Sequence, residues 1–322
     1  MGLTFFIFRL EIQSVRQLRI GITGASGFIG QELVRHLSAQ GHDLVLLSRS
    51  AKKWKQNSTI TVIEADLSQP KAEAIAKFTH DLDLVFHLAA ELNRPSIMQA
   101  INVAGTQAIV NALEEKTTLI YLSSIGIFDF TKGSTIHEDS PFHPQNEYEK
   151  SKLAAEEVIR NKAGLKWIIL RPSIILGQQM KSGLLQQLVR LYQNKLCLKV
   201  DPKVVANFVL ATDVVDALLL LGNTPKAIGQ QYNFSSDLPL SQFLTSLEEA
   251  LKIQKSIAIP AILFQQLLKF FRFIKLISIS RDGVAFFSNT TKISSHKIVK
   301  ELNFEFKADY RSFLKEYVNC TR

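Results

Sequence analysis

A glycine-rich turn between an apolar strand and an amphipathic helix constrains this chain more than any other feature. Residues 18–30 read LRIGITGASGFIG, and the helical pattern begins inside this segment. Gly24 permits a tight turn, Gly27 lets the backbone approach a pyrophosphate, and Gly30 lets the helix lie close to the strand. The first N–H groups of the helix then face the phosphates, with the positive end of the helix dipole behind them. The segment therefore predicts a dinucleotide-binding βαβ unit.

Short β-branched runs alternate with helical stretches through the first half of the chain. The expected strands are 18–23, 44–48, 60–64, 84–88, 119–123 and 167–170, and the expected helices are 28–40, 71–78, 95–115 and 147–161. This alternation predicts an α/β fold with a Rossmann-type doubly wound parallel sheet. After about residue 172, helical stretches dominate. They predict a small, mostly helical C-terminal substrate lobe.

The same pattern divides the chain into three parts. We expect an N-terminal extension over residues 1–17 and an NAD(P)-binding Rossmann domain over residues 18–172. Residues 173–322 form a mixed region, with return elements of the sheet and the C-terminal lobe. Because no Pro-rich or Ser-rich linker separates them, the lobe is expected to pack on the sheet domain.

The end of the second expected strand indicates which dinucleotide binds. An NAD site usually has Asp or Glu there, about 20 residues after the glycines. This chain has Ser48, Arg49 and Ser50, followed by Lys52 and Lys53. The guanidinium of Arg49 is a permanently charged fork that suits a 2′-phosphate. The sequence favours NADP over NAD; if Arg49 only stacks on the adenine, both cofactors stay usable.

Three polar residues form a candidate catalytic group. Tyr148 and Lys152 are four residues apart at the start of an expected helix, so they share one face. A free tyrosine titrates near pH 10, and a neighbouring ammonium together with a positive nicotinamide ring would lower that pKa and make Tyr148 a usable acid and base. Ser124 follows an expected strand, and ligands of a doubly wound sheet bind beyond the carboxyl ends of its strands. We therefore expect Ser124 beside Tyr148, where both meet a substrate carbonyl.

Taken together, these features resemble the extended short-chain dehydrogenases/reductases of the NAD(P)-dependent epimerase/dehydratase superfamily. The similarity covers about residues 18–235 and continues more weakly to the end of the chain. It is carried by motifs in the expected order, at 23–30, 65–67, 87–90, 102–106, 123–124, 148–152, 171–177 and 212–217.

The resemblance implies a role for each motif. Tyr148 would be the acid/base, Lys152 would hold the nicotinamide ribose, and Ser124 would polarise the reacting carbonyl or alcohol during hydride transfer. Asn102 would brace the edge of the sheet. The residues expected to bind the cofactor are Gly24, Ser26, Gly27, Phe28, Ile29, Arg49, Asp66, Leu67, Leu88, Ala89, Ala90, Tyr148, Lys152, Pro172, Ser173 and Ile174.

Departures from the family pattern narrow the function. A dehydratase would carry a carboxylate pair where this chain has Ile125 and Gly126, so that activity is not expected. Phe128 and Asp129 replace a frequent Tyr-Gly of the sugar-nucleotide branch, which weakens the epimerase interpretation. The leading interpretation is an NADP-preferring oxidoreductase acting on an apolar carbonyl or alcohol, or on a sugar nucleotide. The alternatives are a nucleoside-diphosphate-sugar epimerase with tightly bound cofactor, and a non-catalytic NADP-binding or assembly protein.

Charge is distributed unevenly along the chain. Residues 1–159 carry 15 Lys/Arg and 18 Asp/Glu, whereas residues 160–322 carry 23 and 11. A basic half suits an anionic partner such as a phosphorylated substrate or an acidic lipid surface. Because no nucleic-acid-binding motif is present, nucleic acid is not expected. The two cysteines lie far apart and no Cys/His cluster has metal spacing, so neither a disulfide framework nor a metal site is expected.

An apolar stretch near the C-terminus bears on location. Residues 261–280 combine large apolar side chains with a stripe that contains Lys269, Arg272 and Lys275. This pattern predicts either a helix packed in the lobe or peripheral contact with a membrane. A membrane-spanning helix is not expected, because it needs about 20 apolar residues and this stretch carries a stripe of charges. We expect a cytoplasmic protein, free or peripheral at the membrane. The resemblance further implies a homodimer formed by the helices 95–115 and 147–161.

Overall fold

The computed structural model describes residues 17–321 except 55, 132, 179, 181–183, 255–256, 261–262, 264–265 and 267–287. The extension 1–16 and nearly all of the stretch 261–280 therefore lie outside the described residues. Among the helices that the structure describes, none is long and apolar enough to cross a membrane.

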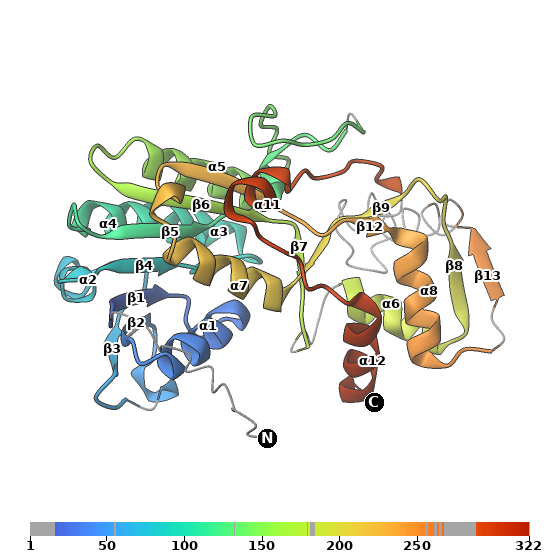
Figure 1. The fold of residues 1–322 in the computed structure, drawn as a ribbon, viewed down its shortest axis with the longest axis horizontal. Coiled ribbons are helices and arrows are strands. Elements are labelled where there is room, and N and C mark those ends of the chain that lie inside the picture. Colours follow the sequence, from blue (N-terminus) through green and yellow to red (C-terminus); the bar gives the residue numbers. More distant parts are fainter. Residues whose placement is uncertain are drawn as a thin grey trace, which may run out of the picture.

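The glycine-rich turn follows the strand β1. This strand belongs to a seven-stranded parallel sheet with the order β11-β6-β5-β4-β1-β2-β3 (Figure 1). The strands are β1 (Arg19–Thr23), β2 (Asp43–Ser48), β3 (Ile60–Glu64), β4 (Leu84–His87), β5 (Thr118–Leu122), β6 (Lys166–Pro172) and β11 (Gln230–Phe234). The strand order reverses between β1 and β4, which is where ligands bind in such sheets. The predicted doubly wound sheet is confirmed.

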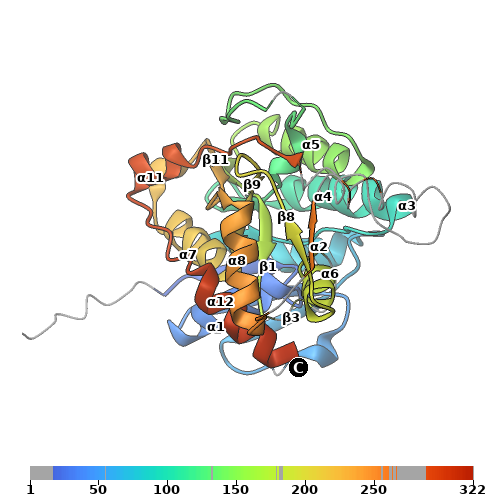
Figure 2. The same ribbon diagram turned by 90° about the vertical axis from the view of Figure 1, so that its right-hand side faces the viewer.

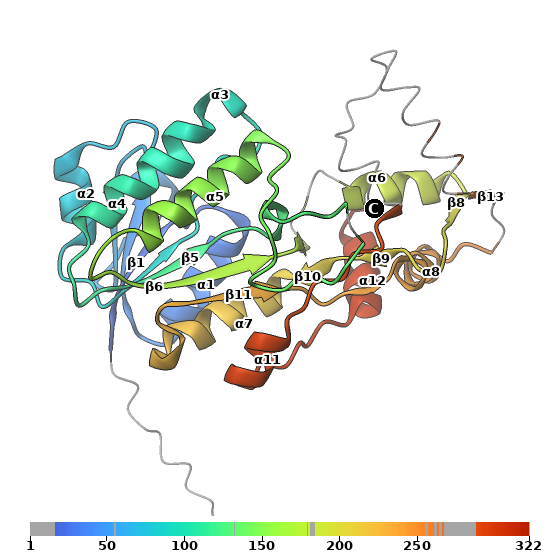
Figure 3. The same cartoon turned by 90° about the horizontal axis from the view of Figure 1, so that it is seen from above.

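Helices cover both faces of the sheet (Figure 3). Successive residues of each strand point to opposite sides, so the apolar strands have apolar side chains to bury on both faces. In β2, Leu44 and Leu46 pack with α1 (Phe28–Ala39) and α7 (Ala211–Gly222). Val45 and Leu47 pack on the other side, in a core with α2 (Ala72–Thr79), α4 (Gly105–Ala112) and α5 (Glu147–Arg160). Strands buried on both faces explain the continuous apolar runs of the sequence.

The helix expected over 95–115 is interrupted. The structure has α3 (Pro95–Met98), a π-helical turn (Gln99–Ala104) and then α4, which ends at Ala112. The π turn places Asn102 so that its side chain bonds both the N–H and the C=O of Glu91, at 2.7 and 3.0 Å. Such turns widen the helix by one residue, and apolar periodicity alone does not reveal them.

A smaller lobe with its own apolar core follows the sheet, as seen on the right of Figure 1 and facing the viewer in Figure 2. Its helices are α6 (Leu184–Gln193), α8 (Leu240–Leu251) and α12 (Tyr310–Thr321), and β8 (Leu196–Lys199) pairs with β13 (Ile257–Pro260). The mostly helical lobe is thus confirmed. The boundary at residue 172 stays a prediction.

Two short strand pairs and one helix join the lobe to the sheet. β7 (Ile174–Leu176) pairs with β10 (Phe208–Leu210), and β9 (Val205–Ala206) pairs with β12 (Leu238–Pro239). The helix α11 (His296–Leu302) packs beside β11. Segments from both halves of the chain therefore meet at the carboxyl ends of β5 and β6.

A buried ion pair links α5 to the sheet. The Arg171 guanidinium donates two hydrogen bonds to the Glu156 carboxylate, at 2.7 and 2.9 Å, and neither side chain is exposed at all. Removing one partner of such a pair leaves an uncompensated charge in a low-dielectric interior.

We predict that Arg171→Met lowers the free energy of unfolding by about 3–5 kcal/mol, as measured by urea denaturation. Lys150→Met is the matched control, because Lys150 pairs with Glu147 at 2.8 Å and both side chains are more than half exposed. The control should cost less than about 1 kcal/mol. Equal losses in the two variants would contradict this interpretation.

Candidate active site

A cleft of about 1570 Å³ runs along the carboxyl ends of the sheet strands, and its lining also includes Asn207 and Ser288–Thr290 from the second half of the chain. Every residue predicted for catalysis or cofactor binding lines this cleft: Gly24, Ser26, Gly27, Phe28, Ile29, Arg49, Asp66, Leu67, Leu88, Ala89, Ala90, Ser124, Tyr148, Lys152, Pro172, Ser173 and Ile174. Their spatial convergence is a property of the fold, whereas their individual roles stay predictions.

The turn after β1 lies directly against the segment that follows β4. Gly24 has φ +70°, and a Cβ at this position would lie 2.6 Å from the backbone nitrogen of Ala89. The same nitrogen donates to the Thr23 hydroxyl at 3.2 Å. Only glycine fits so close an approach, so the turn packs tightly against the end of β4 at the start of α1.

His87 forms the floor beneath this turn, a role that the sequence did not reveal. Its Nδ1 lies 2.6 Å from the Thr23 hydroxyl and its Nε2 lies 2.8 Å from the Thr106 hydroxyl. Burial lowers the pKa of His87 to about 3, with a smaller contribution from the Lys152 charge. The imidazole is therefore neutral at pH 7 and acts as a fixed hydrogen-bonding group that holds β1 against β4.

Arg49 and Asp66 lie together at the end of the cleft near β2 and β3. Arg49 is exposed at the carboxyl end of β2. The pKa of Asp66 is lowered, first by a hydrogen bond from the backbone N–H of Ser68 and further by the Arg49 charge. This end of the cleft thus offers one guanidinium to a ligand phosphate and one ionised carboxylate to a base or ribose.

Ser124 and Tyr148 meet in the middle of the cleft. Ser124 follows β5 with extended backbone and accepts the Gly126 N–H at 3.1 Å, and its side chain is near enough to Tyr148 to lower the pKa of that residue. Tyr148 is the second residue of α5, whose N-terminus is capped by the Asn146 side chain accepting the Glu149 N–H at 3.0 Å. The capped helix end and the strand end fix the two hydroxyls beside each other.

Lys152 is buried one turn further along α5. Its ammonium donates to the Leu122 carbonyl at 2.5 Å and lies 4.1 Å from the centre of the Tyr121 ring. Burial lowers the pKa of Lys152 to about 7, and the Glu156 carboxylate opposes this shift.

Without a cofactor, burial raises the pKa of Tyr148 to about 12, while the Ser124 side chain opposes the rise and the Glu149 charge adds to it. Desolvation disfavours the phenolate, and a sequence does not show how deeply a side chain is buried. Tyr148 therefore keeps its proton at pH 7 and is suited to donate it to a developing alkoxide. The expected lowering of this pKa by the Lys152 ammonium and a positive nicotinamide ring stays a prediction.

The cleft lining at Asn207 and Ser288–Thr290 was missed entirely. Asn207 donates to the Thr291 carbonyl at 3.0 Å and accepts from the Asn289 amide at 2.5 Å, and Asn289 also donates to the Val205 carbonyl. No motif marks these residues, because partners about 80 positions apart in the sequence hold them.

Comparisons with known proteins identify the family. The profile of the NAD dependent epimerase/dehydratase family matches residues 20–235. Since this match covers more than half of the chain, the protein belongs to that family. It is an NAD(P)-dependent enzyme of the extended short-chain dehydrogenase/reductase type.

Individual relatives show how far the similarity extends. The dTDP-D-glucose 4,6-dehydratase of Homo sapiens is 26% identical over 247 residues, which cover 69% of this chain and 70% of that protein. The UDP-glucose 4-epimerase of Mycolicibacterium smegmatis is 26% identical over 254 residues, covering 70% and 79%. The structure of RMD from Pseudomonas aeruginosa complexed with NADPH has a TM-score of 0.68 at 20% identity, with 95% and 100% covered.

A contact between Phe28 and Gly177 generates a prediction about cofactor affinity. Phe28 begins α1, and a Cβ at Gly177 would lie 1.8 Å from Cζ of its ring. Gly177→Ala should therefore displace the ring from the cofactor cradle. Because overpacking costs about 1–3 kcal/mol, and 1.4 kcal/mol is tenfold in affinity, we expect the Kd for NADPH to rise roughly tenfold in a fluorescence titration.

The double variant Phe28→Leu/Gly177→Ala is the control, because the smaller side chain relieves the clash. It should bind NADPH more tightly than Gly177→Ala alone. Unchanged affinity in the single variant would show that the ring can move without consequence.

Proposed function

We propose that this protein is an NADP-preferring oxidoreductase that interconverts a ketone and a secondary alcohol on a sugar carried by a nucleoside diphosphate. The observation that carries the proposal is that Ser124 and Tyr148 line one cleft and lie close enough for the Ser124 side chain to affect the pKa of Tyr148. The same cleft is lined by the glycine-rich phosphate cradle and by Arg49.

The cradle fits a dinucleotide because the backbone at Gly27 lines the cleft without a side chain, and a Cβ there would have only the Gly24 carbonyl oxygen nearby, at 3.1 Å. Bound NADPH would supply the hydride. Tyr148 donates its proton to the carbonyl oxygen as that oxygen gains negative charge, and Ser124 donates a hydrogen bond that orients it. Lys152 lies where its ammonium can hold the nicotinamide ribose.

Three features support a sugar nucleotide as the substrate class. The cleft volume of about 1570 Å³ exceeds the roughly 300–1,000 Å³ of a pocket for one small molecule, so a second ligand fits beside a dinucleotide. The curated relatives named above act on dTDP-D-glucose and UDP-glucose by their names. The cleft lining combines amides and hydroxyls with Phe128, Phe130 and Ile175, which suits a sugar ring.

The epimerase is the second candidate, favoured by the similarity to a UDP-glucose 4-epimerase. An epimerase oxidises and re-reduces one carbon, so it consumes no net cofactor. The two functions separate in one assay: absorbance at 340 nm with NADPH and UDP- or dTDP-linked 4-keto-6-deoxyhexoses, beside product analysis with UDP-glucose. Stoichiometric oxidation of NADPH supports the reductase, and conversion of UDP-glucose without oxidation supports the epimerase. If neither reaction occurs, the result indicates a non-catalytic protein.

We predict that Arg49→Ala weakens NADPH binding by about 10- to 100-fold, because a hydrogen bond to a charged group contributes roughly 1.5–3 kcal/mol. NADH binding should change little, since NADH lacks the 2′-phosphate. Lys52→Ala is the matched control, because Lys52 is a nearby exposed cation outside the cleft lining. Equal affinities for NADPH and NADH in the unaltered protein would remove the argument for NADP.

We predict that Tyr148→Phe lowers kcat by about 10²–10⁴-fold while the Kd for NADPH changes less than about twofold, because only the proton donor is removed. Tyr232→Phe is the control: it deletes a buried hydroxyl on β11, outside the cleft lining, that reaches Glu301 at 3.3 Å. Full turnover by Tyr148→Phe would refute both the reductase and the epimerase.

A further inference from the structure

Three side chains of α5 at four-residue spacing contact three consecutive residues at the end of β5. Tyr148 meets the Ser124 hydroxyl and Lys152 meets the Leu122 carbonyl, as described above. The third side chain, Glu156, accepts a hydrogen bond from the Ser123 hydroxyl at 2.5 Å. Residues four apart share one helix face, so the spacing itself could have pointed to Glu156.

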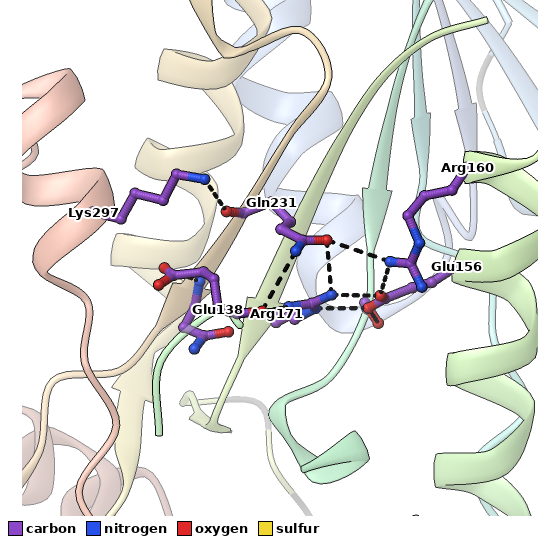
Figure 4. A network of polar contacts seen from close by, with 8 residues as sticks. Glu138, Glu156, Arg160, Arg171, Gln231 and Lys297 are labelled. Carbon is purple, nitrogen blue, oxygen red and sulfur yellow. Dashed lines mark hydrogen bonds and ion pairs between the residues drawn. The ribbon is translucent and has the colours of Figure 1, made fainter. Parts of the chain in front are cut away.

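Glu156 is held rigidly by cations from two elements (Figure 4). The Arg171 guanidinium of β6 donates to both carboxylate oxygens, at 2.9 and 2.7 Å, and Arg160 donates to Oε2 at 2.7 Å. Glu156 and Arg171 are fully buried, and hydrogen bonding to Arg171 keeps the pKa of Glu156 low despite its burial. The carboxylate is therefore ionised and has four donors around it.

Arg171 is fixed in turn by the second half of the chain (Figure 4). Its Nη2 donates to the Gln231 side chain at 3.0 Å and its Nη1 to the Glu138 carbonyl at 3.3 Å. Lys297 of α11 then donates to the Gln231 carbonyl at 3.2 Å. The chain of contacts thus runs from α11 through β11 and β6 to the end of β5.

We propose that Glu156 is a positioning residue that fixes the place of Ser124 opposite Tyr148 by holding the side chain of Ser123. Ser123 and Ser124 are adjacent in the chain, so a bond that fixes the Ser123 side chain also constrains the backbone that carries Ser124. The inference rests on the proposed function, because it presupposes that Ser124 and Tyr148 act on the substrate.

The hydrogen bond to Ser123 goes beyond what the ion pair needs. Arg171 and Arg160 already balance the Glu156 charge. The Ser123 hydroxyl, which is buried, adds a link from that fixed carboxylate to the backbone that carries Ser124. A displacement of about 1 Å of a positioned group can cost on the order of 100-fold in rate.

Ser123→Ala is the decisive variant, because it removes the link and keeps the ion pair that the fold requires. With NADPH and a UDP- or dTDP-linked 4-keto-6-deoxyhexose, we expect kcat to fall about 10- to 100-fold. KM and the Kd for NADPH should stay within about twofold, because the Ser123 hydroxyl is bonded to Glu156 and is not free to bind a ligand, although Ser123 lines the cleft. Thr117→Val is the matched control: it deletes a buried hydroxyl at the opposite end of β5, bonded to the Leu82 carbonyl at 2.7 Å, and should leave kcat unchanged.

Glu156→Gln and the double variant Ser123→Ala/Glu156→Gln test whether the two residues act through one bond. If they do, the double variant loses no more kcat than Glu156→Gln alone, because coupled residues are not additive. Fully additive losses would overturn the proposal. If Glu156→Gln does not fold, Ser123→Ala decides alone.

Hydrogen exchange gives a readout that needs no substrate. Amides of residues 122–126 should exchange faster in Ser123→Ala than in the unaltered protein or in Thr117→Val, with the midpoint of thermal unfolding nearly unchanged. Unchanged exchange would overturn the proposal even if the probe is not turned over. Tyr148→Phe separates the proposed function from the positioning role of Glu156. Full activity in Tyr148→Phe refutes the proposed function. If Tyr148→Phe is inactive and Ser123→Ala is fully active, only the positioning role is refuted.

Discussion

The buried ion pair between Glu156 and Arg171 joins the parts of the protein that have to stay in register. It ties the helix that carries Tyr148 and Lys152 to the strand β6 at two short hydrogen bonds. Through Gln231 the pair also contacts β11, which comes from the second half of the chain. Because a buried charge is costly without its partner, the helix, both strands and the end of β5 are held in one arrangement.

Burial determines the pKa values of the two titratable groups in the middle of the proposed site. It raises the pKa of Tyr148 to about 12 and lowers the pKa of Lys152 to about 7, since desolvation disfavours the charged form of each. The site therefore holds a protonated phenol beside a lysine that titrates near neutrality. Such a tyrosine gives up its proton when an oxygen beside it becomes negative, which is what carbonyl reduction requires.

The sequence predicts what local patterning controls. The glycine turn, the parallel strands and the residues that line the cleft all follow from motifs next to recognisable strands, and the structure brings those residues together. It does not predict what tertiary contacts decide: the π turn that aims Asn102, the cleft lining at Asn207, or the link from Glu156 to Ser123. The burial that raises the pKa of Tyr148 to about 12 in the protein without cofactor does not follow from the spacing of Tyr148 and Lys152 either.

The central claim is that this cleft transfers hydride between a nicotinamide cofactor and a carbon held beside Ser124 and Tyr148. The most direct measurement uses NADPH labelled with deuterium at nicotinamide C4 and analyses the product of a nucleotide-linked keto-sugar by mass spectrometry and proton NMR. With the transferable position labelled, the account predicts one deuterium on the new carbinol carbon and none when the opposite face is labelled. Product formed without deuterium from either labelled form would contradict direct hydride transfer in this cleft.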